Sequence, residues 1–93
     1  MSDALFQLRD SVEDETSFLL FVKQLAGDRV ASEPMSQTND GFQGEWANQT
    51  ISQFLEAASA WAEDSDFGTR PGPKPSNPWQ LFAQFLVAGR SYE

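Results

Sequence analysis

Three stretches of the chain repeat apolar residues at helical spacing, and we predict a helix for each of them. The first covers about residues 16–30, where Asp14 is a suitable N-cap. Its apolar face consists of Phe18, Phe21, Val22, Leu25 and Ala26, widened by Leu19 and Val30. Leu20 points to the opposite side, either as a single exposed apolar residue or as an anchor for a partner.

The second predicted helix, about residues 49–64, has the clearest pattern. Its apolar stripe is Ile51, Phe54, Leu55, Ala58, Trp61 and Ala62, and Glu56, Glu63 and Asp64 lie on the opposite side. Asn48 or Thr50 can cap its start. Trp46 precedes the cap and can pack back on the first turn as a hydrophobic staple.

The third predicted helix covers about residues 77–88. Asn77 is a good N-cap, Pro78 suits the first helical position, and Gly89 is a natural end. Its strongest apolar face is Leu81, Phe82, Phe85 and Leu86. Because so few of its positions are polar, we expect this helix to pack against both others, with Trp61 and Phe82 in the core.

The remaining segments are less regular. In residues 2–12 the spacing of Leu5, Leu8 and Val12 fits a helix face that Ser2 or Asp3 can cap, but the segment is short, so a single turn or an extended arm is also open. Residues 31–48 and 65–76 are rich in Gly and Pro and are expected to be long loops, functional or mobile. We therefore predict an all-α fold for residues 1–93, a single small domain. It has a three-helix core, a short N-terminal element and two long loops.

Composition excludes most catalytic chemistry. The 93 residues include neither Cys nor His, which removes thiol nucleophiles, thiolate metal sites and the usual general base. Asp64-x-Asp66-x-Gly68 begins like a calcium loop, but the position that needs a bidentate acid is Pro75. Glu56 and Glu63 are expected on an exposed face, not flanking a cleft as catalytic carboxylates do. We expect no enzymatic activity, no cofactor and no metal.

Charge indicates the kind of partner. Six Lys and Arg residues against 14 Asp and Glu residues give a net charge of −8. This balance disfavours direct contact with nucleic acid and favours a basic protein as partner. The chain shows no secretory signal and no apolar run long enough for a membrane span, so we expect a cytoplasmic protein that does not enter the membrane.

The aromatic residues supply the candidate binding surface. Most of the eight Phe, three Trp and one Tyr fit core positions, but Phe42, Trp46 and Phe67 lie in or beside loops. With Glu56, Glu63 and Asp64 they form the predicted partner-binding set; Trp46 can equally be a packing residue.

Three functions fit this sequence. The leading hypothesis is a non-catalytic protein–protein interaction module. An alternative is an immunity or inhibitor protein that neutralises a basic toxin or nuclease. A third is a subunit that self-associates through apolar residues such as Leu20 or Val87.

Two motifs also carry a family resemblance, which covers residues 14–93. They are Trp46-x-Asn48-x-Thr50-Ile51-x-x-Phe54-Leu55-Glu56-Ala57-x-x-Ala60-Trp61-x-Glu63-Asp64 and Asn77-Pro78-Trp79-x-x-Phe82-Ala83, followed by a closing Tyr92-Glu93. The chain resembles a family of small, acidic, uncharacterised bacterial proteins, a domain of unknown function. The resemblance implies a bacterial, mostly helical, cytoplasmic protein and supplies no activity and no site residues.

Overall fold

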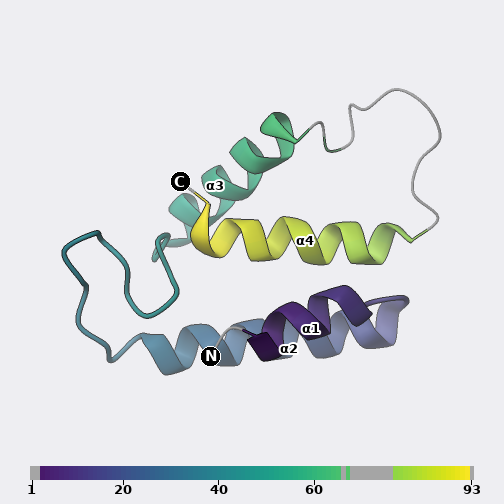
Figure 1. Ribbon diagram of the computed structural model, residues 1–93, viewed down its shortest axis with the longest axis horizontal. Coiled ribbons are helices and arrows are strands. Elements are labelled where there is room, and N and C mark those ends of the chain that lie inside the picture. Colours follow the sequence, from purple (N-terminus) through teal and green to yellow (C-terminus); the bar gives the residue numbers. More distant parts are fainter. Residues whose placement is uncertain (1–2, 66, 68–76, 93) are drawn as a thin grey trace.

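The computed structural model describes residues 3–65, 67 and 77–92, which form four helices. They are α1 (Asp3–Ser11), α2 (Glu15–Ser32), α3 (Ile51–Asp64) and α4 (Pro78–Ser91). Helix α4 runs through the middle of the molecule, with α3 on one side and the α1–α2 hairpin on the other (Figure 1). The predicted helical class is confirmed, and so is the central place of the last helix.

The helices that we predicted begin at the expected caps. The Asp14 carboxylate accepts a hydrogen bond from the Ser17 backbone N–H at 2.9 Å and another from the Ser17 hydroxyl. These two bonds, the backbone one first, lower the pKa of Asp14 below its ordinary value. Thr50 Oγ1 accepts from the Gln53 N–H at 3.1 Å, and Asn77 Oδ1 accepts from the Gln80 N–H at 3.3 Å. Each cap satisfies an N–H group that the helix itself leaves unpaired.

The predicted ends are less accurate than the starts. Helix α2 continues to Ser32, and α4 continues through Gly89 to Ser91. We predicted that the helix ends at Gly89, and this was wrong. Gly89 is a buried helical residue facing Phe54 of α3. Its missing side chain lets α3 and α4 approach closely.

The N-terminal element is a helix of nine residues and part of the core. Leu5 on α1 and Val12 just after it are both buried against α2 and α4. The prediction of a three-helix core was therefore wrong, and all four helices contribute. So short a helix is marginal alone, and it is stabilised here by the apolar surface that it buries.

Small side chains occupy the centre of α4. The buried hydrophobic residues are Leu5, Val12, Phe21, Leu25, Trp46, Ala57, Ala58, Ala83 and Val87, whereas Phe82 is 44% exposed. Leu81, Phe85 and Leu86 are only partly buried, and so is Trp61 on α3. The predicted strong face of this helix is thus displaced from the centre, because closely packed helices need small residues where their axes approach and leave larger ones at the margins.

The apolar faces of α2 and α3 are also narrower than the periodicity indicated. Leu19, Ala26 and Val30 on α2 are exposed, and so are Ile51 and Leu55 on α3. The reason is the arrangement of the helices. Among the described helices, α3 packs on α4 alone, and its backbone does not come close to α1 or α2, so neither of these two helices covers its other sides.

Side-chain hydrogen bonds hold the connection between α2 and α3 in a defined path. Arg29 donates to Gln43 Oε1 at 2.7 Å and to the Gln49 carbonyl at 3.1 Å. Gln43 in turn donates to the carbonyls of Glu33 and Met35, each at 2.9 Å. The first predicted loop is thus tied to the end of α2.

The prediction for the second loop, residues 65–76, lies outside the described residues apart from Ser65 and Phe67. Within the described ranges, none of the helices combines the length and apolar character needed to cross a membrane.

Candidate functional site

The six residues predicted to bind a partner lie in separate places. Glu56 and Glu63 are exposed on the outer side of α3, away from α4. Phe42 is half-buried in the loop before α3, and Phe67 packs on Trp61 with ring centroids 5.7 Å apart. The structure therefore brings only the two glutamates together on one exposed surface.

Asp64 at the end of α3 faces α4 instead. The Tyr92 hydroxyl donates a hydrogen bond to Asp64 Oδ2. This hydrogen bond, burial and the negative charge of Asp64, in that order, raise the pKa of Tyr92 above its ordinary value. Asp64 thus helps to join the ends of α3 and α4.

Trp46 is a core residue. It is 5% exposed, and its indole Nε1 donates to Asp28 Oδ2 at 2.9 Å. Its ring stacks on Phe54, with centroids 5.9 Å apart, and the Arg29 guanidinium lies 5.5 Å from its ring centroid. The contact with Phe54 in the first turn of α3 is the predicted staple, and burial leaves no exposed ring for a partner.

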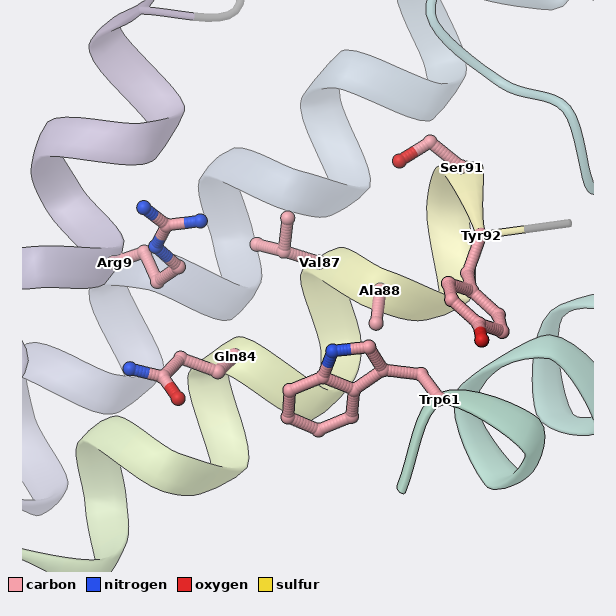
Figure 2. Close-up of a pocket in the computed structure, with 7 residues that line it drawn as sticks. All are labelled: Arg9, Trp61, Gln84, Val87, Ala88, Ser91 and Tyr92. Carbon is pink, nitrogen blue, oxygen red and sulfur yellow. The ribbon is translucent and has the colours of Figure 1, made fainter. Parts of the chain in front are cut away.

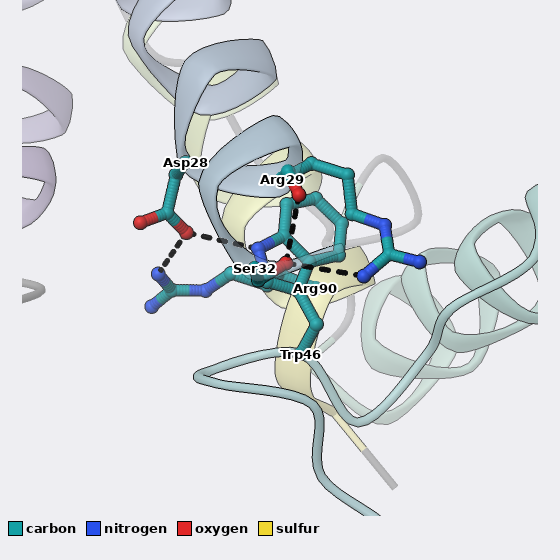
Figure 3. Close-up of polar contacts among 5 residues, drawn as sticks. All are labelled: Asp28, Arg29, Ser32, Trp46 and Arg90. Carbon is teal, nitrogen blue, oxygen red and sulfur yellow. Dashed lines mark hydrogen bonds and ion pairs between the residues drawn. The ribbon is translucent and has the colours of Figure 1, made fainter. Parts of the chain in front are cut away.

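A buried ion pair lies beside Trp46 (Figure 3). Arg90 is 1% exposed, and its Nη1 donates at 3.1 Å to the same Asp28 oxygen that accepts from Trp46. The guanidinium also lies 5.5 Å from the Phe6 ring centroid. These contacts connect Asp28 of α2 and Arg90 of α4 with Phe6 of α1 and with Trp46 of the loop before α3. Sequence reasoning missed this ion pair because Asp28 and Arg90 are 62 residues apart and neither belongs to a recognisable motif.

Alternate residues of the segment 46–50 each have a structural task. Asn48 Nδ2 donates to the carbonyls of Gly89 and Tyr92 at 3.1 and 2.9 Å, and the Asn48 N–H donates to the Arg90 carbonyl at 3.2 Å. These bonds satisfy carbonyl groups at the end of α4 that have no partner within the helix. Trp46 packs in the core and Thr50 is the N-cap of α3, so this segment joins the start of α3 to the end of α4.

The outer side of α3 exposes two large apolar side chains next to its acidic ones. Ile51 is 81% exposed and Leu55 is 54% exposed. At 100° per residue, these two lie on one flank of the helix, and Glu56 and Glu63 lie on the next. We call these four residues the α3 outer face.

An open pocket of about 430 Å³ lies between α1, α3 and α4 (Figure 2). Arg9 of α1 lies on one side of it, and Trp61 and Tyr92 lie on the other. Four residues of α4 complete the lining: Gln84, Val87, Ala88 and Ser91.

Val87 is a buried core residue, so of the two side chains expected to support self-association only Leu20 is on the surface.

Among residues 3–65, 67 and 77–92, no three acidic side chains gather in a way that could hold a metal ion.

Comparison with curated proteins and with solved structures finds no match to this chain. Comparison with family models does find one, over residues 14–93, which include α2, α3 and α4. The chain therefore belongs to a family of unknown function, DUF7660.

Proposed function

We propose that this protein is a non-catalytic protein–protein interaction module and that the α3 outer face is its contact surface. The observation that carries the proposal is the exposure of Ile51 and Leu55 on a helix that, of the three other described helices, packs on α4 alone. Large apolar side chains that a fold leaves together in water are typical of contact surfaces.

The charge beside these residues indicates the partner's chemistry. Glu56 directly follows Leu55, Glu63 lies two turns further along the same helix, and the whole chain has a net charge of −8. A complementary partner presents an apolar cavity bordered by Lys or Arg side chains. Such charge complementarity accelerates association at low ionic strength and weakens with added salt.

A narrower form of the proposal is an immunity or inhibitor protein for a basic toxin or nuclease. The strongly acidic balance supports it, since an acidic inhibitor is attracted to the basic surface that such a target uses to bind nucleic acid.

The test is affinity capture from a lysate of the source organism, with washes at low and then high salt. We expect the wild-type chain to retain one basic protein that salt elutes. A double variant, Ile51→Ser with Leu55→Ser, should lose it while keeping the circular dichroism spectrum of a folded helical protein.

The matched control is Leu20→Ser, which removes an exposed apolar side chain on α2 and should retain the partner. Replacing Glu56 and Glu63 with Gln should let the partner elute at lower salt. Equal capture by the double variant, or no captured protein at low salt, would contradict the proposal.

A further inference from the structure

The pocket between α1, α3 and α4 collects hydrogen-bond donors that have no acceptor among the described residues. Arg9 Nε donates to Asp10 at 3.0 Å, but the two terminal nitrogens of the same guanidinium have no acceptor there. The same is true of the Trp61 indole N–H and the Ser91 hydroxyl. A cavity of about 430 Å³ falls within the size range of small-molecule sites.

The pocket differs in charge and polarity from one end to the other. At one end lies the Arg9 guanidinium, held 4.9 Å from the Phe6 ring centroid. At the other end the Tyr92 hydroxyl donates to the Asp64 carboxylate. Arg9 is the one cation among the residues that line the pocket, and its own carboxylate partner, Asp10, is 61% exposed to solvent, so negative charge is more favourable beside Arg9 than beside Asp64. Between them the lining includes the Ala88 methyl group and the Trp61 ring (Figure 2). A ligand that fits has its negative charge at Arg9 and an apolar body against Trp61.

We propose that this pocket binds a small organic carboxylate with an aromatic or aliphatic body. Because Arg9 Nε is engaged with Asp10, the free donors are the two terminal nitrogens, which form a planar fork. Such a fork matches the two oxygens of a carboxylate, whereas a phosphate dianion meets only one cation on a chain of net charge −8. This site is separate from the α3 outer face and does not depend on the interaction proposal.

The test is a titration of the ¹⁵N-labelled chain with sodium phenylacetate and with sodium hexanoate, followed by ¹H–¹⁵N correlation spectra. The chain has three Trp residues, and the spectrum of Trp61→Phe assigns the Trp61 indole signal. We expect saturable shifts of that signal and of the Ala88 and Ser91 amides. Phenylacetamide has the same ring without the charge and should leave these signals in place.

Variants separate the charge from the shape of the pocket. Arg9→Gln should weaken binding about tenfold or more, because it removes a charge-assisted hydrogen bond. The matched control is Lys23→Gln, which removes an exposed cation of α2 that does not line the pocket and should leave the affinity unchanged. Ala88→Leu fills the pocket without altering α1 and should abolish the shifts.

Three results would overturn the proposal. One is the absence of saturable shifts with both carboxylates up to about 10 mM, where a ligand of millimolar Kd occupies most of its site. The others are equal shifts with phenylacetamide, or an unchanged affinity in folded Arg9→Gln and Ala88→Leu variants.

Discussion

The contact between α3 and α4 depends on Gly89, and Gly89→Ala tests it. A Cβ atom at this position would lie 2.9 Å from Cε1 and 3.0 Å from Cζ of the Phe54 ring. It would also lie 3.0 Å from the Phe54 carbonyl oxygen. The ring can turn, but the carbonyl belongs to the α3 backbone, so the two helices must separate. Phe54 also stacks on Trp46, so the displacement reaches the core.

Two opposing effects determine the magnitude. Alanine in place of glycine within a helix stabilises it by up to about 1 kcal/mol. Forcing an extra carbon into a packed contact costs about 1–3 kcal/mol, and the rigid carbonyl places this site at the upper end. We therefore expect Gly89→Ala to lower the free energy of unfolding by about 1–2 kcal/mol. The control is Gly27→Ala in α2, where a Cβ atom meets nothing within 4 Å. This substitution should raise the free energy of unfolding by about 0.5–1 kcal/mol.

Urea unfolding followed by circular dichroism measures both variants. With a slope of about 1 kcal/mol per molar urea for so small a protein, the midpoint should fall by about 1–2 M in Gly89→Ala and rise by about 0.5–1 M in Gly27→Ala. Trp fluorescence of Gly89→Ala should change as well, since Trp46 contacts the displaced ring. A Gly89→Ala midpoint equal to or above that of the wild type, with Gly27→Ala stabilised as expected, would refute the close approach of α3 and α4.

Three further predictions concern the core, the buried ion pair and the first cap. Phe21 is fully buried, whereas Phe82 is 44% exposed. Phe21→Ala should therefore lower the free energy of unfolding by about 3–5 kcal/mol and Phe82→Ala by about half of that. Equal urea midpoints for the two variants would contradict this assignment of the core. Asp28→Asn leaves the Arg90 guanidinium without its counter-charge and should lower the free energy of unfolding by about 2 kcal/mol. The loss is smaller than for a fully buried pair because the Asp28 side chain is 31% exposed. An unchanged thermal midpoint would exclude a structural role for the pair. Hydrogen bonds from Ser17 in the first turn of α2 lower the pKa of Asp14. The contribution of Asp14 to the free energy of unfolding is therefore complete above the pKa that Asp14 has in the unfolded chain, and it is lost as pH falls through its pKa in the folded chain. The midpoint difference between the wild type and Asp14→Ala should therefore narrow from about pH 6 to about pH 2, and a constant difference would count against the cap.

Features that depend on neighbouring residues were predictable from the sequence. The caps at Asp14, Thr50 and Asn77 join atoms three residues apart, so the residue types alone specify them. The staple of Trp46 on Phe54 is almost as local. The candidate contact surface was predictable in part: Glu56 and Glu63 are exposed, as their helical positions indicated.

Features that depend on which helices meet were not predictable. An apolar stripe shows that some neighbour covers a helix but not how wide that neighbour is, so the exposure of Ile51, Leu55 and Phe82 appears only in the packed molecule. A glycine near a helix end is compatible with a stop, and only the packed molecule shows that α4 continues through Gly89 and that α3 approaches it closely.

The amino-acid pattern alone thus determined the helical class, the helix starts and the acidic exterior, because each follows from interactions within one or two turns or from composition. Tertiary packing decided that α1 belongs to the core and that Asp28 and Arg90 pair. It also brought Arg9 of α1 to the same pocket as Trp61 of α3. These residues are distant in sequence, and their proximity follows from burying apolar surface on several helices at once, which no single segment encodes.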